Sequence, residues 1–113
     1  MSGCLFCKIV DGTVPVERVY EDEVSIAFRD INPQAPSHVL VVPKEHVASL
    51  AEAAVEQTAL LGKLMAAAAE VARQQKLARG YRVVVNTGAE GGQTVAHLHL
   101  HVLGGRHMAW PPG

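Results

Sequence analysis

Apolar and polar residues alternate strictly in the segment HLHLHVLGG, which runs from His97 to Gly105. Successive side chains of a β-strand point to opposite faces, so this period of two predicts a strand that is half buried. Leu98, Leu100 and Val102 belong to the face expected against a core, and three histidines belong to the other face. We expect the histidine face to be open to solvent. Because three imidazoles in a row have no packing role there, this face is where chemistry is expected.

Four further strands are predicted from short runs of apolar and β-branched residues. Two of the runs flank an acidic turn at residues 21–23 and are expected to form a hairpin. A third is a nearly continuous apolar run stopped by Pro43, and the fourth precedes a glycine-rich loop at residues 87–93. The predicted strands cover residues 16–20, 24–28, 38–42 and 81–86.

The middle third of the chain has the three- and four-residue spacing of an amphipathic helix. Ser49 and Glu52 have the spacing of a capping box, which predicts the helix start near Ser49. Gly80 follows the basic residues Lys76 and Arg79, an order typical of a helix C-terminus. The apolar stripe of this helix consists of Leu60, Leu61, Leu64, Met65, Ala68, Val71 and Ala72.

Five predicted strands with one long helix between the third and the fourth favour an α+β fold, with an antiparallel sheet covered on one side. A doubly wound parallel sheet is disfavoured, because a helix interrupts the predicted sheet only once. With 113 residues, the chain is expected to form one domain that spans residues 1–113.

The composition and charge of the chain exclude several functional classes. Hydrophobic residues make up 49% and charged residues 19%, as in a globular protein, and the formal net charge of −1 provides no basic footprint for nucleic acid. No apolar run reaches the roughly 18 residues of a membrane helix, and the N-terminus lacks the pattern of a signal peptide. We expect a cytoplasmic protein whose partners include neither nucleic acid nor membrane.

The spacing of the three histidines argues against one shared metal ion. Same-face neighbours on a strand are about 6.6 Å apart, so His97 and His101 are about 13 Å apart, whereas Zn–N bonds are about 2 Å. A zinc hydrolase centred here would need a carboxylate that converges with two of the histidines. Separate roles along a groove fit better. The imidazole of His99 is suited to attack on phosphorus, with His101 donating to a phosphate oxygen or to the leaving group.

Two other features have possible chemical roles. The loop at residues 88–94 can bring backbone N–H groups and the Thr94 hydroxyl near an anion, although it lacks the lysine of a P-loop. Cys4 and Cys7 form a C-x-x-C pair, which in a cytoplasmic protein favours metal ligands or free thiols over a structural disulfide. A zinc site at these cysteines requires two more ligands. Without those ligands the cysteines are a reduced, buried thiol pair.

The histidine segment resembles the signature of the histidine triad (HIT) family, in which histidines alternate with bulky apolar residues. The resemblance covers nearly the whole chain and is strongest for the branch of purine nucleoside phosphoramidases. It rests on the segments CLFCKI, FRDINPQAPSHVLVVPKEH, GYRVVVNTG, GGQTVAHLHLHVLGGR and WPPG.

This resemblance implies a fold and a reaction. The fold is a five-stranded antiparallel sheet with one long and one short helix, continued across a homodimer, with Trp110 near the partner's site. The reaction is cleavage of the P–N bond of a purine nucleoside phosphoramidate, such as AMP linked to an amine, through a nucleotidyl-histidine intermediate on His99. His101 would bind phosphate and assist the leaving group, His97 would orient the strand, and His38 would support the triad from the neighbouring strand.

The resemblance also assigns the contacts to a purine nucleotide substrate. Asp30 would hold the ribose hydroxyls, and Asn86, Gln93 and Thr94 would lie at the phosphate or its surroundings. The apolar slot for the purine base would consist of Phe6, Ile9, Phe28 and Ile31.

Relatives with both cysteines resemble zinc-binding forms of the family. A structural zinc ion is therefore expected on Cys4, Cys7, His46 and His97, with no metal required for catalysis. Two other functions stay open at this point. One is hydrolysis of dinucleoside polyphosphates within the same fold, and the other is a nucleotide-binding regulatory role with weak catalysis.

Overall fold

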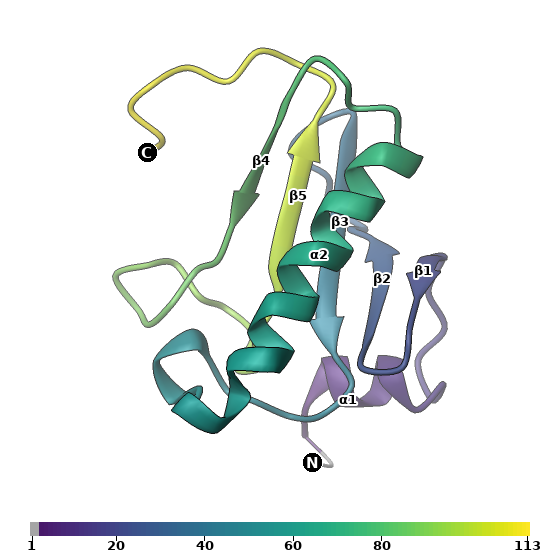
Figure 1. Cartoon of the computed structure of the whole chain (residues 1–113), viewed down its shortest axis with the longest axis vertical. Coiled ribbons are helices and arrows are strands. Elements are labelled where there is room, and N and C mark those ends of the chain that lie inside the picture. The colour runs from purple at the N-terminus through teal and green to yellow at the C-terminus, as the bar shows by residue number, and fades with distance from the viewer. Residues whose placement is uncertain (1–2) are drawn as a thin grey trace.

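The computed structural model describes residues 3–113 and contains an antiparallel sheet of five strands. The predicted α+β class, the antiparallel sheet, and one long and one short helix are confirmed. No helix in this part of the chain combines the length and apolarity needed to cross a membrane. The sheet order is β1-β2-β3-β5-β4, and the elements are α1 (Leu5–Val10), β1 (Arg18–Glu21), β2 (Ser25–Arg29), β3 (Ser37–Pro43), α2 (Thr58–Gln74), β4 (Tyr81–Val84) and β5 (Leu100–Gly104) (Figure 1).

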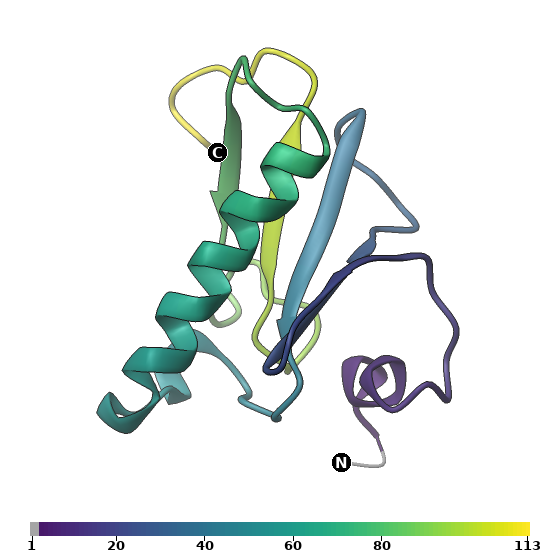
Figure 2. The same ribbon diagram turned by 45° about the vertical axis from the view of Figure 1, so that its right-hand side comes forward.

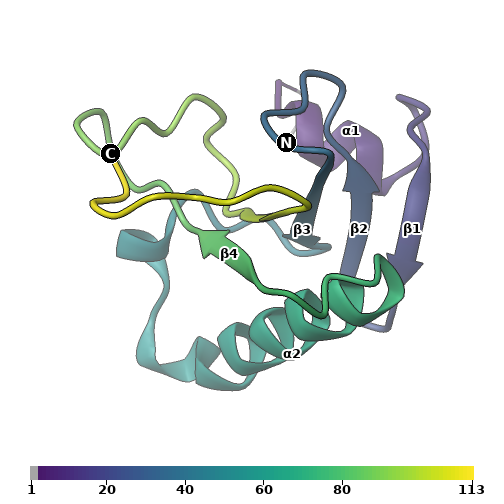
Figure 3. The same ribbon diagram turned by 90° about the horizontal axis from the view of Figure 1, so that it is seen from above.

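Both faces of the sheet are covered, whereas the sequence predicted a cover on one face. α2 lies across one face and the short helix α1 lies on the opposite side (Figure 2). The view from above shows the strands between the two helices (Figure 3). Phe6 and Ile9 of α1 are 4% and 3% exposed, so even this short helix buries two large side chains against the sheet. The two-sided cover explains why β3 is buried along its whole length and reads as a continuous apolar run.

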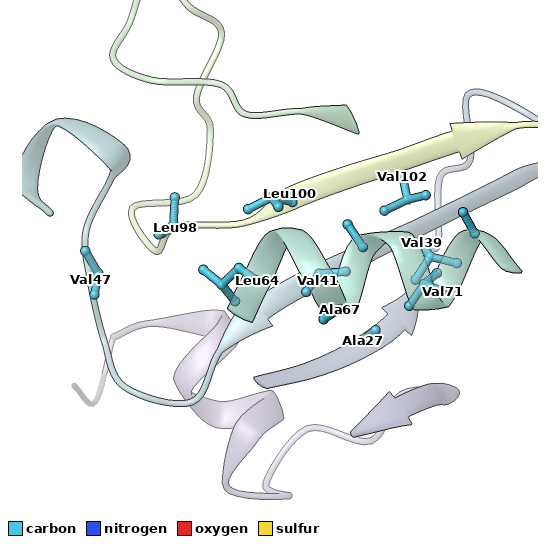
Figure 4. Packing of buried hydrophobic residues seen from close by; sticks show 12 residues of the cluster. Ala27, Val39, Val41, Val47, Leu64, Ala67, Val71, Leu98, Leu100 and Val102 are labelled. Carbon is cyan, nitrogen blue, oxygen red and sulfur yellow. The ribbon is translucent and has the colours of Figure 1, made fainter. Parts of the chain in front are cut away.

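The larger core fills the space between α2 and the sheet (Figure 4). Leu64 and Val71 of α2 are at most 1% exposed and belong to one cluster with residues of β2, β3 and β5. Leu98, Leu100 and Val102 belong to the same cluster and are at most 3% exposed. The predicted inward face of the histidine segment is therefore confirmed.

α2 begins at Thr58, and the start predicted near Ser49 is wrong. Ser49 makes no capping hydrogen bond with its side chain, and two 3₁₀ turns occupy the interval before α2. The side chain of Gln57 accepts the backbone N–H of Ala54 at 2.8 Å, and the carbonyl of Ala54 accepts the N–H of Gln57 at 2.9 Å. The Gln57 side chain thus makes one of the two hydrogen bonds of a capping box, the one to the backbone N–H of Ala54. The chain can therefore turn into α2 without a capping hydroxyl.

α2 ends at Gln74, so the helix cap predicted at Gly80 is also wrong. The residue in the left-handed region after the helix is Lys76, with φ of 61°. The N–H groups of Lys76 and Leu77 donate to carbonyls of the last turn, each at 3.0 Å, in the pattern of a Schellman motif. Leu77 then packs against the main core. This apolar contact, which the periodicity of the helix does not reveal, selects the earlier end.

Candidate active site and metal centre

Two of the three histidines, His97 and His99, are buried and His101 is half-buried, so the predicted exposure of this face to solvent is wrong for the first two. His97 is 0% exposed and His99 is 5% exposed, and the regular strand starts only at Leu100. The ring of Phe6 covers both imidazoles edge-on, with ring centroids 5.9 Å from His97 and 5.1 Å from His99. Alternation along a strand identifies two faces, but it does not show which later or earlier element covers the second one.

A groove of 450 Å³ opens over the histidine face, within the range of about 300–1,000 Å³ that is typical of small-molecule sites. Phe6, Ile9 and Phe28 are at most 4% exposed and form its apolar floor, whereas Ile31 is 96% exposed and stands at its rim. The groove brings together nine of the predicted site residues, which are Phe6, Ile9, Phe28, Asp30, Ile31, His38, Thr94, His99 and His101.

One ring nitrogen of His99 is held by the backbone, which leaves the other available. The Nδ1 atom lies 2.7 Å from the carbonyl oxygen of His97. A carbonyl oxygen only accepts hydrogen bonds, so Nδ1 carries the proton and the lone pair of the neutral ring is on Nε2. Because His99 lines the groove, this arrangement suits a nucleophilic imidazole.

A chain of hydrogen bonds sets the tautomer of His101. The backbone N–H of Gln34 donates to Nδ1 of His38 at 3.0 Å, so the proton of neutral His38 is on Nε2. Nε2 of His38 lies 2.8 Å from Nδ1 of His101, to which it donates. His101 consequently carries its own proton on Nε2. That N–H is a hydrogen-bond donor for an anion in the groove.

The groove histidines His38 and His101 are neutral at physiological pH. Burial, followed by the neighbouring rings of His99 and His38, lowers the pKa of His101 to about 4. Burial also lowers the pKa of His38, and the carboxylate of Asp30, 3.4 Å away, opposes that shift. The pair can therefore recognise a phosphate through hydrogen bonds without carrying positive charge.

Asp30 has a local structural role in addition to its place in the groove. Its Oδ1 atom accepts the backbone N–H of Asn32 at 2.9 Å, which closes an Asx turn. Its Oδ2 atom lies 3.4 Å from Nε2 of His38. The turn leaves the second oxygen at the groove wall, so a contact with ribose hydroxyls stays a prediction.

Asn86 and Gln93 brace the glycine-rich loop and lie outside the set of residues that line the groove in the described structure. Asn86 Nδ2 donates to the carbonyl of Gly91 at 2.7 Å. Gln93 accepts the N–H of Gly88 at 3.1 Å and donates to two further backbone carbonyls, at 2.8 and 3.0 Å. Their side-chain donors shape the loop that precedes Thr94, and phosphate contact by either amide stays a prediction.

Two of the groove residues that were not predicted are Gln34 and Leu40. Gln34 orients His38 through its backbone N–H, and side-chain chemistry gives no signal for such a role. Leu40 lines the groove two residues after His38, on the same face of β3. The period of two along the strand could have identified Leu40, because residues i and i+2 of a strand share a face.

The residues predicted to bind zinc converge beside α1. One ligand atom from each of Cys4, Cys7, His46 and His97 lies within 4.8 Å of the others. His97 donates from Nε2 to the carbonyl of Pro43 at 2.9 Å, so its Nδ1 carries a lone pair. That Nδ1 lies 3.3 Å from Cys4 Sγ, 3.6 Å from Cys7 Sγ and 3.2 Å from His46 Nδ1.

These distances fit a tetrahedral zinc ion. With bonds of about 2.3 Å to sulfur and about 2.0 Å to nitrogen, tetrahedral ligands stand about 3.3 Å (N–N) and about 3.5 Å (N–S) apart. The observed N–N distance is 3.2 Å and the N–S distances are 3.3 to 3.6 Å. Both cysteines are free thiols, and the Pro43 carbonyl orients the imidazole of His97 as expected of a ligand.

A second group of possible metal ligands consists of Asp30, His38 and His101. A carboxylate therefore does converge with one triad histidine and with His38. The 2.8 Å between the two ring nitrogens is a hydrogen-bond distance, shorter than the spacing of about 3.3 Å that two nitrogens on one tetrahedral zinc would have. The geometry favours the hydrogen bond at this position.

Known proteins are similar to this chain in sequence and in fold. Residues 11–108 match the HIT domain. The crystal structure of a HIT family hydrolase from Legionella pneumophila is similar to this chain with a TM-score of 0.96 and 47% identity, covering 98% of this chain and all (100%) of that one. A 14 kDa zinc-binding protein of Zea mays is 50% identical over 114 residues, covering 99% of this chain and 89% of the maize protein. A histidine triad nucleotide-binding protein from Candida albicans has a TM-score of 0.82 and 30% identity, covering 96% of this chain and 83% of that chain.

Proposed function

Because this chain belongs to the HIT domain family, we propose that it is a nucleotide hydrolase that cleaves the P–N bond of purine nucleoside phosphoramidates. The observation that carries the proposal is the tautomer of His99. Its Nδ1 proton is held by the carbonyl of His97 at 2.7 Å, and its Nε2 lone pair is free to attack phosphorus. The hydrolase of Legionella pneumophila and the nucleotide-binding protein of Candida albicans support the choice of reaction class and ligand.

The first step forms a covalent bond between His99 and the nucleotide. The Nε2 lone pair attacks phosphorus, the P–N bond to the amine breaks, and the departing amine takes a proton from solvent. The Nε2–H of His101 donates a hydrogen bond to the phosphate or the leaving nitrogen. The low pKa of His101, about 4, keeps it a neutral donor throughout.

The second step returns His99 to its starting state. Water attacks the phosphorus of the nucleotidyl-histidine, its proton passes to solvent, and the bond to Nε2 breaks, which releases the nucleoside monophosphate. During both steps the apolar floor of Phe6, Ile9 and Phe28 would hold the purine, with Asp30 on the ribose. Thr94, at the end of the glycine-rich loop, would donate its hydroxyl to the phosphate.

We propose that Cys4, Cys7, His46 and His97 bind a structural zinc ion. The tetrahedral fit of their ligand atoms and the zinc-binding relative from Zea mays support this assignment. The ion would fasten α1 to the segment that begins the histidine row, and so hold Phe6 over His99. Apart from the substrate and water, all reacting groups of the proposed mechanism are protein side chains, and zinc would contribute position only. A thiol pair used for metal binding also suits the proposed cytoplasmic location.

We propose a homodimer in which two sheets join through the free edge of β4. The outer edge of β1 carries a bulge at Arg18–Tyr20 and an exposed Arg18–Glu21 ion pair, and both features discourage pairing. The register of β4 with β5 is regular, and its sequence YRVV contains a single charge. The exposed Trp110 follows in the tail, which Arg82 of β4 holds through backbone carbonyls.

The decisive experiment is steady-state hydrolysis of a fluorogenic adenosine phosphoramidate. We expect turnover by the wild-type protein and a loss of at least about a thousandfold in kcat for His99→Ala, as for other covalent nucleophiles. His107→Ala, which removes an exposed tail histidine outside the groove, is the matched control and should retain wild-type kcat.

Two other outcomes would redirect the assignment. Faster cleavage of diadenosine polyphosphates than of the phosphoramidate would favour a dinucleoside polyphosphate hydrolase. Binding of AMP by the wild-type protein without turnover of either substrate would favour a nucleotide-binding regulatory protein.

A further inference from the structure

A second groove lies at the other end of β5, beside the start of β4. It has a volume of 260 Å³ and is formed where the chain leaves α2 for β4 and where β5 runs into the C-terminal tail, at the top of Figure 1. An adjoining hollow shares Arg79, Gly80, Arg106 and His107 with it and extends it toward Arg82. Neither hollow shares a lining residue with the groove over the histidines.

The walls of this basic groove carry one sign of charge. Lys76, Arg79 and Arg106 line the 260 Å³ hollow and Arg82 lines the adjoining one. Together they are four of the 10 lysines and arginines in a chain of net charge −1. The lining includes no aspartate or glutamate, and none of these four cations forms an ion pair within residues 3–113. Cations gathered without counter-charges repel one another, so an anion bound between them relieves that repulsion.

Two of the guanidinium groups are already held in position. Arg106 donates from Nε to the carbonyl of Gln34 at 3.1 Å and from Nη1 to the carbonyl of His107 at 3.2 Å. Arg82 donates to the carbonyls of Met108 and Ala109. Carbonyl partners leave the positive charge uncancelled and leave each guanidinium with further N–H donors. An anion would therefore meet donors whose rotamer freedom is already restricted.

Lys76 reaches this groove from a backbone position that disfavours it. Its φ of 61° lies in the left-handed region, which glycine occupies without strain and a lysine does not. The Schellman motif alone would favour glycine at this position. Because glycine would be more stable at this position and lysine contributes a cation to the basic groove, we infer that Lys76 has a role other than stabilising the fold.

We propose that this basic groove binds a multiply charged phosphate anion of the diphosphate or triphosphate class. Planar guanidinium groups match phosphate oxygens in pairs, which favours phosphate over a simple halide or a single carboxylate. The volume of 260 Å³ suits a short phosphate chain. The three cations that line this hollow, together with Arg82 in the adjoining one, match the charge of such a chain. The basic groove is distinct from the catalytic groove, so the inference stands whether or not the proposed hydrolysis is correct.

The basic groove also touches the loop that orients the active-site histidines. Arg106 holds the carbonyl of Gln34, and the N–H of Gln34 holds Nδ1 of His38. Gly105, with φ of 92°, packs so closely on Pro36 of this loop that an added Cβ would lie 2.9 Å from it. An anion on Arg106 therefore binds next to the support of the catalytic groove without entering it.

Calorimetric titration of the full chain with tripolyphosphate, in 0.15 M KCl, tests the proposal. We expect one site per chain, and a Kd raised at least about tenfold in Lys76→Gln/Arg79→Gln. The control Lys44→Gln/Lys63→Gln removes two lysines elsewhere and should bind as the wild type does. Saturation with AMP should leave tripolyphosphate affinity unchanged, because the two grooves share no lining residue.

The other outcomes each overturn the proposal. Competition by AMP would place the anion in the catalytic groove. An equal loss of affinity in both double variants would show attraction by overall charge without a site. No heat and no protection of the wild type against thermal unfolding by tripolyphosphate would show that the groove binds no such anion. Turnover of the phosphoramidate is measured separately, so failure of either proposal is distinguishable from failure of the other.

Discussion

At the scale of single residues, backbone groups decide what each histidine can do. Carbonyl oxygens hold the protons of His99 and His97, which leaves Nε2 of the first and Nδ1 of the second with lone pairs. A backbone N–H fixes the tautomer of His38 and, through it, that of His101. Three similar alternating histidines thereby differ in which ring nitrogen carries a lone pair, as their proposed roles of nucleophile, neutral donor and metal ligand require.

The low pKa of His101 predicts a loss of stability in acid. In the unfolded chain this residue takes up a proton below its ordinary pKa of 6.5, whereas in the folded protein it does so only near 4. Its contribution to the free energy of unfolding is thus complete above pH 6.5 and lost as the pH falls to 4, by at most about 3 kcal/mol.

Urea unfolding at several pH values checks this contribution. Between pH 7 and 4 the wild type should lose more stability than His101→Asn, whose amide keeps a hydrogen-bonding partner for His38 but does not titrate. His107→Asn, an exposed control, should follow the wild type. Parallel pH profiles for the wild type and His101→Asn would contradict the shifted pKa.

The metal centre predicts a dependence of stability on zinc. Cys7→Ser removes the sulfur that lies 3.3 Å from Nδ1 of His46, so we expect bound zinc to fall from about one per chain to nearly none. Loss of a ligand present at a thousandfold its Kd lowers the free energy of unfolding by roughly 4 kcal/mol. Metal analysis and thermal unfolding measure both effects.

Chelation provides the matched comparison for this centre. A chelator should lower the Tm of the wild type to that of Cys7→Ser and leave the variant unaffected. His107→Asn should keep its zinc. A Cys7→Ser protein that retains stoichiometric zinc would remove this cysteine from the ligand set.

At the scale of elements, tertiary contacts decide where α2 begins and ends. Gln57 and the backbone of Ala54 cap its start. Leu77, which is half-buried and packs against the main core, favours an end of the helix at Gln74. The consequence is a lysine in the left-handed conformation, next to the basic groove. The helix end thus connects the packing of the core with the proposed anion site.

Replacement of Lys76 by glycine should raise stability and weaken anion binding. Relief of the left-handed strain is expected to add about 1 kcal/mol to the free energy of unfolding. The control Lys63→Gly, at an exposed interior position of α2, should cost about 1 kcal/mol instead. Urea unfolding and tripolyphosphate titration of both variants separate the two effects. A destabilised Lys76→Gly protein would contradict the strain at this position.

At the scale of the whole molecule, the sheet has one protected edge and one open edge. β1 ends the sheet with a bulge and an ion pair, and β4 ends it with a regular, mostly apolar strand. An open edge of this kind is a surface for pairing with another strand. It therefore determines which side of the molecule a second copy would join.

The proposed dimer predicts that Val84→Lys is monomeric. A two-fold axis perpendicular to β4 would pair the two copies of this short strand antiparallel and place two new lysines near one another. Their repulsion should shift the population to monomer at micromolar concentrations. Sedimentation equilibrium measures the mass. Thr13→Lys adds the same charge at an exposed loop position far from β4 in the chain and should stay dimeric. A wild-type monomer, or a dimeric Val84→Lys protein, would contradict the interface at β4.

Local periodicity was sufficient to predict the class of the fold. The period of two identified the strands and the inward face of Leu98, Leu100 and Val102, and the helical spacing identified α2, because both periods depend only on neighbouring residues. The resemblance to the HIT family, together with the C-x-x-C pair, identified nine residues that line the groove and the four residues of the candidate zinc cluster, whereas Asn86 and Gln93 lie outside the groove lining.

The tertiary structure alone decided the properties that depend on distant parts of the chain. Cys4 and His97 are 93 residues apart in sequence, and α1 buries the histidine face from that distance. The tautomers follow from carbonyl and N–H groups that no side-chain pattern encodes, and the end of α2 follows from a contact of Leu77 with the core. Sequence periodicity specifies which way a side chain points. The burial of a side chain, its protonation and the ends of a helix depend on contacts with distant parts of the folded chain.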